Sequence, residues 1–208
     1  MRVLNIVASP RKEKSASAAI VDAFLSEYKE RAGNLLVDTL DIWQERLPEF
    51  DFEAINAKYK GVSGEPMTPV ETATWEKIRE LSSRFQRADR IVLGVPMWNF
   101  SVPYKLKQLI DLSCQRNMLF TFDGKCYGPL LSIDKAFVAY VRGQSDEAGF
   151  KTVSRPGFEY LSSYVEFWLR FIGVRNVVTL TVEHTWDGHA VDVIDAGKRQ
   201  AVELARQF

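Results

Sequence analysis

The sequence is poor in cysteine and has no excess of charge of either sign. Its 208 residues include two cysteines, Cys114 and Cys126, and 27 Lys and Arg residues stand against 27 Asp and Glu residues. The cysteines form neither a CxxC motif nor a metal-ligand cluster, and such sparse use is typical of a reducing cytosol with buried thiols. A formal net charge of zero provides no broad basic surface, so neither nucleic acid nor a membrane is expected as a partner.

Long apolar runs and the common nucleotide motifs are also missing. No stretch approaches the roughly 20 apolar residues of a membrane-spanning helix, and the apolar N-terminal stretch is too short for a secretory signal, so we expect a cytoplasmic protein. There is no GxGxxG and no Walker GK[ST] loop, which disfavours a dinucleotide site and a triphosphate site. His184 and His189 flank a "WDGH" turn without the spacing of a metal site, so no metal is expected.

Apolar segments of strand length alternate with segments of helical periodicity along the chain. Several of the strand-like segments are apolar at nearly every position, as is typical of parallel strands covered by helices on both faces. The predicted strands are 3–9, 34–42, 90–96, 135–141 and 177–184. The predicted helices are 16–31, 74–88, 104–115, 158–171 and 191–208. This alternation predicts an α/β fold, with a doubly wound five-stranded parallel sheet in a single domain over residues 1–208.

The segment 43–69 differs from the rest of the chain. It is long, rich in Pro and Gly, and carries Phe50, Phe52 and Tyr59. A connection of this length inside a compact domain is usually a functional flap or an interface element. We predict an extended segment here and assign no helix to it.

In an open parallel sheet, ligands bind beyond the carboxyl ends of the strands, so the loops after the first, third and fourth strands are the places to search. The first is "SPRKEKSAS", residues 9–17, which leads into a predicted helix. Its serine hydroxyls and the N–H groups at the helix start are suited to a phosphate, with Arg11, Lys12 and Lys14 adding positive charge. The alternative is a helix capped by Ser15 after a solvated basic loop.

The second loop lies in "PMWNFSVPYKLKQLID", residues 96–111, where Pro103 opens a predicted helix. Met97, Trp98 and Phe100 could lie against a planar ring, with backbone N–H groups directed at its heteroatoms; the alternative is that they cap the core. The third loop, "VRGQ" at 141–144, contains Gly143, which allows close approach of a ligand. The alternative there is a plain turn. Residues 146–148, "DEA", are predicted to be a solvated edge.

These motifs resemble the FMN-dependent NADH:azoreductases, relatives of the NAD(P)H:quinone oxidoreductases with a flavodoxin-like fold. The likeness also includes "TFDGKCYGPLLSIDKAFVAYVRG" and "RFIGVRNV", and runs through nearly the whole chain. The stretch 96–111 is its most specific part.

The resemblance implies which residues bind FMN. The implied phosphate contacts are Ser9, Ser15, Ala16 and Ser17. The implied contacts of the isoalloxazine ring are Met97, Trp98, Asn99 and Phe100, and those of its pyrimidine side are Val141, Arg142, Gly143 and Gln144. The family often has Tyr at the position of Trp98 and a second Gly at that of Gln144. The indole keeps a flat surface, whereas Gln144 narrows or polarises the pocket.

The resemblance further implies an enzyme that moves two electrons from NADH or NADPH to quinones, azo compounds or nitroaromatics by a ping-pong mechanism. No side chain is expected to be a catalytic acid or base, because the flavin performs the chemistry. A homodimer is implied, with two FMN sites at its interface and the segment 43–69 helping to roof them. Two alternatives remain open. An FMN electron carrier without its own NAD(P)H-dependent activity is usually acidic, whereas this chain is neutral, and a receiver domain needs acidic residues where Ser9 and Trp98 stand.

Overall fold

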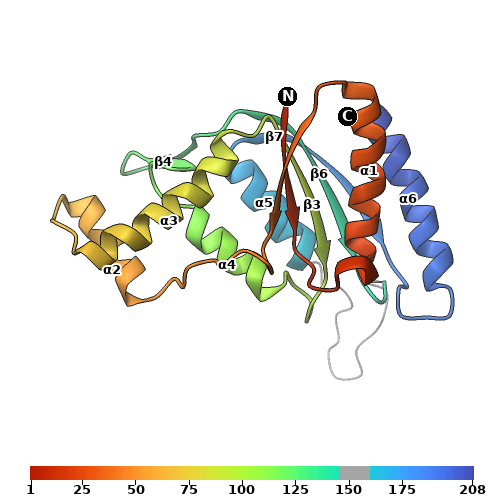
Figure 1. Cartoon of the computed structure of the whole chain (residues 1–208), viewed down its shortest axis with the longest axis horizontal. Helices are drawn as coiled ribbons and strands as arrows, with labels where there is room; N and C mark the ends of the chain where they lie inside the picture. Colours follow the sequence, from red (N-terminus) through yellow and green to blue (C-terminus); the bar gives the residue numbers. More distant parts are fainter. Residues whose placement is uncertain (146–159) are drawn as a thin grey trace.

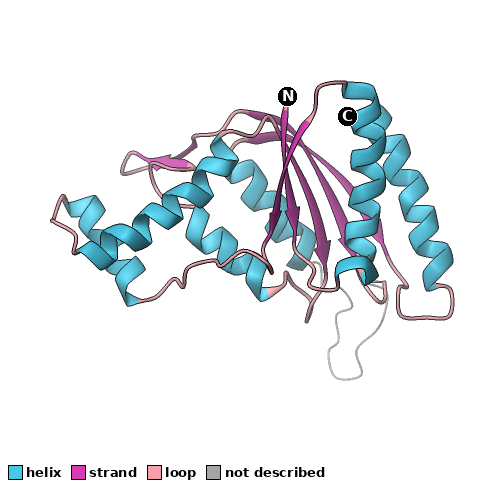
Figure 2. Ribbon diagram, viewed as in Figure 1, coloured by secondary structure: helices cyan, strands magenta, loops and turns pink. Residues whose placement is uncertain are grey.

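The computed structural model of the chain describes residues 1–145 and 160–208. Its central sheet has five parallel strands: β1 (Arg2–Val7), β2 (Leu36–Asp41), β3 (Arg90–Pro96), β6 (Ile133–Val141) and β7 (Val174–Val182). The strand order is β2-β1-β3-β6-β7, and helices cover both faces (Figures 1 and 2). The predicted doubly wound α/β fold is therefore confirmed.

The burial of the strands follows their place in the sheet. The three inner strands β1, β3 and β6 are buried along most of their length, whereas the edge strands β2 and β7 expose several positions. Strands with both faces covered by helices need apolar side chains at consecutive positions, and these were the segments most clearly read from the sequence.

One face of the sheet is covered by α1 (Ala16–Ala32) and α6 (Ala190–Arg206), which lie side by side (Figure 1). Phe24 of α1 stacks on Phe137 of β6 with ring centroids 3.9 Å apart. The opposite face is covered by α3 (Pro69–Gln86), α4 (Tyr104–Ser113) and α5 (Tyr160–Ile172). Residues 158 and 159, where the last of these was predicted to start, lie outside the described residues.

The segment predicted to be without a helix contains one. Helix α2 (Phe52–Ser63) is capped by Asp51, whose Oδ1 accepts a hydrogen bond from the N–H of Ala54 (3.1 Å). It packs against α3, and the Lys60 ammonium lies 2.8 Å from a carboxylate oxygen of Glu71. We call α2 and the first half of α3 the arm; it projects from the body at the left of Figure 1.

Helix α3 begins five residues before the predicted start, at Pro69. Thr68 and Glu71 form a reciprocal capping box, which fixes this start. A Pro at the first helical position after a Thr is a recognisable start signal that the periodicity alone did not reveal.

A short antiparallel hairpin, not predicted from the sequence, joins α4 to β6. Its strands are β4 (Phe120–Phe122) and β5 (Tyr127–Pro129). In the turn between them, Asp123 Oδ1 accepts hydrogen bonds from the N–H groups of Lys125 and Cys126, both at 2.8 Å. Cys126 is exposed in this turn, so the expectation of two buried thiols is wrong for it, while Cys114 is half-buried.

Candidate functional site

The three loops singled out in the sequence follow adjacent strands and meet at one edge of the sheet. β1 has β2 on one side and β3 on the other, and β6 follows β3, so the strand order reverses at β1. Val7 pairs with Gly94, and Pro96 pairs with Val141, which brings the three strand ends level with one another. This edge is the usual ligand site of an open α/β sheet.

The loop after β1 places three buried hydroxyl groups at the start of α1. Ser9, Ser15 and Ser17 are 4%, 3% and 2% exposed. Ser15 Oγ accepts a hydrogen bond from the N–H of Ala18 (3.2 Å) and lies 3.2 Å from Ser17 Oγ. The alternative of a helix capped by Ser15 is therefore correct as a description of Ser15 itself.

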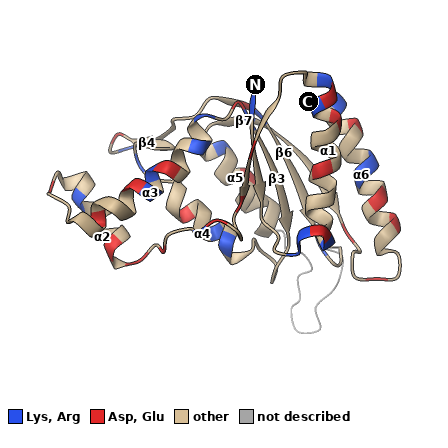
Figure 3. Cartoon of the chain, in the orientation of Figure 1, with Lys and Arg blue, Asp and Glu red and all other residues tan. Residues whose placement is uncertain are grey.

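The same helix start keeps donors for a ligand. Within the described parts of the chain, the N–H groups of Ala16 and Ser17 donate to no acceptor. Arg11, Lys12 and Lys14 are exposed beside them, with the exposed Glu13 between the two lysines. Figure 3 shows Lys and Arg positions in blue, with an acidic position among them, at the start of α1. Two unpaired N–H donors, buried hydroxyls and the positive end of a helix dipole fit a single phosphate group.

The loop after β3 contains a strained turn. The N–H of Trp98 donates to the carbonyl of Ser101 (2.9 Å), and the N–H of Ser101 donates to that of Trp98 (3.0 Å). Between them Asn99 and Phe100 both have positive φ, 46° and 68°. Asn tolerates this conformation, but a bulky residue such as Phe is an outlier there, and strain of about 1–3 kcal/mol per residue is found mainly at ligand sites. No local pattern in the sequence indicates this strain.

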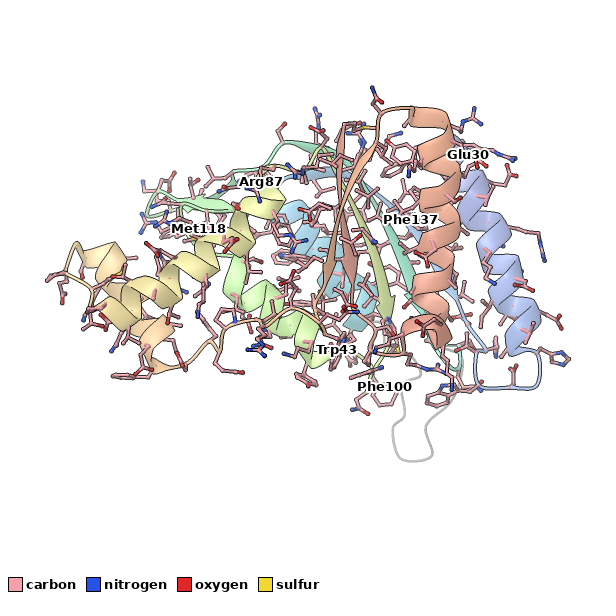
Figure 4. All side chains as sticks on the ribbon, viewed as in Figure 1. Glu30, Trp43, Arg87, Phe100, Met118 and Phe137 are labelled. Carbon is pink, nitrogen blue, oxygen red and sulfur yellow. The ribbon has the colours of Figure 1, made fainter. Side chains whose placement is uncertain are left out.

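Trp43, which follows β2, belongs to this site and was missed as a site residue. Its indole N–H donates to the carbonyl of Ala8 (3.0 Å), directly before Ser9. Its ring centroid lies 5.6 Å from that of Trp98 and 5.4 Å from that of Tyr104. Figure 4 shows Trp43 and Phe100 near the same end of the sheet. Trp43 after β2, Trp98 after β3 and Tyr104 at the start of α4 thus form one aromatic wall.

The remaining members of the loop after β3 divide between core and surface. Met97 is partly buried against the main core, and its N–H donates to the carbonyl of Val141 (2.8 Å). Phe100 is 44% exposed. The alternative of a core residue therefore describes Met97, whereas Phe100 presents its ring outside the core.

The turn after β6 is fixed to the segment after β7. The buried Arg142 donates through Nε to Glu183 Oε1 (2.8 Å), and its carbonyl accepts from Thr185 Oγ1 (3.0 Å). A Cβ at residue 143 would lie 2.2 Å from the ring of Trp186. Gly143 thus makes room for an indole of its own chain, which the sequence did not indicate. Val141 is buried in the core, and Gln144 is exposed.

A cavity of about 860 Å³ opens beside Trp98, between the loop after β3 and α5. Its lining includes Trp98, Asn99, Tyr104, Lys107 and Tyr164. Burial raises the pKa of the Tyr164 phenol, so this group stays protonated at neutral pH. The volume is within the range of small-molecule sites, and the aromatic lining suits a planar ligand.

The other predicted features lie at the surface or outside the described residues. His184 Nδ1 is 3.4 Å from Asp187 Oδ2, and His189 is exposed. Within residues 1–145 and 160–208, no three His, Cys, Asp or Glu side chains are grouped as a metal site would require. No helix in those ranges has both the length and the apolar character needed to span a bilayer. The segment 146–148 lies outside the described residues.

Comparison with known proteins identifies the family of this chain. The flavodoxin-like fold family matches residues 1–205. The chain belongs to this family. The FMN-dependent NADH:quinone oxidoreductase 2 of Burkholderia lata is 57% identical over 208 residues, covering 100% of both chains. The FMN-dependent NADH:quinone oxidoreductase 9 of the same organism is 41% identical and covers 100% of this chain and 99% of its own.

Solved structures give the same assignment. The azoreductase from Bacillus anthracis str. Sterne matches with a TM-score of 0.87 and 27% identity, covering 100% of both chains. The resemblance drawn from the loop motifs is thereby confirmed.

Proposed function

We propose that the chain is an FMN-dependent oxidoreductase that transfers two electrons from NADH to quinones and azo compounds. One observation carries this proposal: a single-phosphate site at the start of α1 and a strained aromatic turn meet at the edge of the sheet where the strand order reverses. The names of the relatives, quinone oxidoreductases at 57% and 41% identity and an azoreductase structure, support it.

The residues of the site divide into three groups by role. Ser9, Ser15, Ala16 and Ser17 bind the phosphate, through hydroxyls and the N–H groups at the start of α1. Met97, Trp98, Asn99 and Phe100 hold the ring system, while Val141, Arg142, Gly143 and Gln144 border its pyrimidine side. One phosphate site and no second nucleotide fingerprint favour FMN over FAD.

When bound, FMN would accept a hydride and later pass two electrons to an acceptor. The chain contributes binding, orientation and exclusion of water. Trp98 and Tyr104 give the cavity a flat wall on which a nicotinamide and then an acceptor ring can lie. Because both reactants use this one cavity in turn, the kinetics are ping-pong. Nitroaromatics fit the same flat space, and the electron donor is NADH or NADPH.

A homodimer completes the proposal. Three aromatic side chains that line the cavity are largely exposed in one chain: Tyr104 is 64%, Tyr160 66% and Phe167 65% exposed. Exposed apolar rims of this kind mark contact surfaces. A second copy covers the rim, and the arm with the rest of residues 43–69 roofs the partner's site. Each chain is one flavodoxin-like domain, and the protein works in the cytoplasm.

The test uses purified protein. We expect a yellow sample that releases FMN on heating, oxidises NADH with benzoquinone and an azo dye, and gives parallel double-reciprocal lines. Light scattering is expected to report a dimer at micromolar concentration. A yellow protein that consumes no NADH with either acceptor would be an electron carrier instead, and a colourless protein that takes up no FMN would refute the proposal.

A further inference from the structure

A second cavity, of about 320 Å³, lies between the arm and the segment 115–118 that precedes β4. It is lined by Lys58, Gly61, Val62, Met67, Trp75, Arg79, Gln115, Arg116, Asn117 and Met118. None of these residues lines the cavity beside Trp98. Figure 4 labels Met118 in this region and Phe100 at the carboxyl end of the sheet, well separated in the view. Its volume is at the lower end of the range for small-molecule sites.

The charges around this cavity have one sign. Lys58, Arg79 and Arg116 line it, and no Asp or Glu does. Among residues 1–145 and 160–208, none of the three cations has a carboxylate within 4.0 Å, although the neighbouring Lys60 is paired with Glu71. In a chain of zero net charge, three cations gathered without an acid attract an anion.

Beside the polar residues Gln115 and Asn117, the uncharged part of the lining is aromatic and apolar. Trp75 offers an indole, and Met67 offers a flexible thioether that adapts to a ring placed against it. Met118 is 5% exposed, and its sulfur accepts from Ser82 Oγ (3.3 Å), so it forms a fixed wall. Lys58 already lies 5.8 Å from the centroid of the Phe50 ring, so this cation is held near aromatic surface.

One buried polar atom in the lining has no partner. Gln115 is 2% exposed, and its Nε2 donates to the carbonyl of Asp111. Its Oε1 is buried, and no donor among the described residues reaches it. A buried acceptor without a hydrogen bond is unfavourable, so a ligand with a hydroxyl or amino group that reached it would be favoured.

We infer that this cavity binds a small aromatic anion, a carboxylate or a sulfonate on one or two fused rings. The acid group lies among Lys58, Arg79 and Arg116, and the ring lies against Trp75 and Met67. A guanidinium donates two parallel N–H hydrogen bonds to the oxygens of a carboxylate or a sulfonate. A neutral ring has no such pair of acceptor oxygens. The inference does not depend on the proposed function, because none of the lining residues belongs to the serine loop, to the turn after β3 or to the turn after β6.

The experiment is calorimetric titration of the full FMN-loaded protein with naphthalene-2-sulfonate, whose charge does not change with pH. We expect one molecule bound per chain, and binding about tenfold weaker in Arg79→Ala. Arg79→Lys should recover part of the loss. The matched control is Arg87→Ala, an exposed arginine at the end of the same helix and outside the cavity, which should bind like the unaltered protein. Neutral 2-naphthol should bind more weakly than the sulfonate.

Three outcomes would overturn the inference. Absence of binding is the first. Equal weakening in Arg79→Ala and Arg87→Ala would mean unspecific attraction to surface charge. Weakening in Tyr104→Ala but not in Arg79→Ala would place the sulfonate in the cavity beside Trp98. The inference stands only if the sulfonate binds more weakly in Arg79→Ala and binds to Arg87→Ala and Tyr104→Ala as it does to the unaltered protein.

Discussion

The indole of Trp186 lies where a side chain of residue 143 would be. A Cβ built on Gly143 would be 2.2 Å from one ring carbon of Trp186 and 2.6 Å from two others. Trp186 is otherwise 82% exposed. The loop after β7 therefore packs on the turn that we assign to the pyrimidine side of the flavin, and Thr185 and Glu183 hold the same turn through Arg142.

This contact gives a double-mutant prediction. Gly143→Ala should lower the free energy of unfolding of the apo protein by about 1 kcal/mol or less, because the added methyl group overlaps the indole, but Trp186 is 82% exposed and can turn into solvent. In a Trp186→Gly background the same change should cost much less, because the ring is gone. Urea unfolding of the four proteins measures this coupling. Equal costs in both backgrounds would mean that the Trp186 ring does not occupy this space.

The cofactor affinity of the same four proteins tests the assignment of the turn. If residues 141–144 border the flavin, Gly143→Ala should also weaken FMN binding, and removal of the ring should restore it in part. Fluorescence titration with FMN provides the measurement. FMN affinity that stays constant across the set would make this turn a structural element only.

The inner strands, and the strand ends at which the candidate site was sought, could be predicted from the sequence, because they depend on local patterns. The run 90–96 is apolar at nearly every position and is β3 without change of bounds. The serine loop and the stretch 96–111 could be assigned because both follow such runs. Helix α2 was hidden, since Pro48, Gly61 and Gly64 gave its surroundings the composition of a loop, and only the cap at Asp51 marks its start.

The contacts between distant segments could not be read from the chain. Trp43 reaches Ala8 across 35 positions, and Trp186 reaches Gly143 across the whole of α5 and β7. Neither pair has a spacing that a local pattern reveals. The positive φ of Phe100 is likewise a result of the closed turn, because nothing in the residue itself favours that conformation.

The strained turn predicts different effects on stability for two substitutions at Asn99. Asn99→Gly should leave the free energy of unfolding within about 1 kcal/mol of the unaltered protein, since Gly adopts positive φ without steric cost. Asn99→Val should lower it by about 1–2 kcal/mol, because a β-branched residue is disfavoured at φ 46°. Thermal unfolding of both apo variants compares them. Equal stability of the two would contradict the left-handed conformation at this residue.

The two thiols should differ in reactivity. Burial, followed by the nearby Asp111 carboxylate, raises the pKa of the Cys114 thiol to about 11, whereas Cys126 is exposed in the hairpin turn. Because the thiolate is the reactive form, iodoacetamide at pH 8 should modify Cys126 first and Cys114 far more slowly. Mass spectrometry of the native protein gives the order, and Cys126→Ser should leave a nearly unreactive chain. Rapid labelling of Cys114 would show that its surroundings are open to solvent.

The arm should loosen in acid. The hydrogen bond from Lys60, with that from the Thr68 N–H, lowers the pKa of Glu71. Because the pKa of Glu71 in the folded protein lies below its ordinary value of 4.5, the ionised carboxylate contributes fully to stability above about pH 4.5. This contribution is lost as the pH falls through the lower, folded-state pKa. The protection factors of the α2 amides, which are exchange rates corrected for the intrinsic rate at each pH, should therefore be lower at pH 3.5 than at pH 7. Glu71→Gln keeps an acceptor for the cap but not the charge, so its exchange should depend less on pH.

The phosphate site yields the most selective prediction, because riboflavin is FMN without the phosphate. Ser17 is 2% exposed and lies 3.2 Å from the cap residue Ser15. Ser17→Ala removes a hydroxyl donor and leaves the cap in place, so it should weaken FMN binding about tenfold with little change in riboflavin binding. Ser15→Ala should weaken FMN binding and also lower the free energy of unfolding by about 0.5–2 kcal/mol, since the cap of α1 is lost. Fluorescence titrations with both flavins, beside urea unfolding of the apo proteins, separate the two roles. Equal losses for FMN and riboflavin in Ser17→Ala would mean that this serine supports the loop rather than the phosphate.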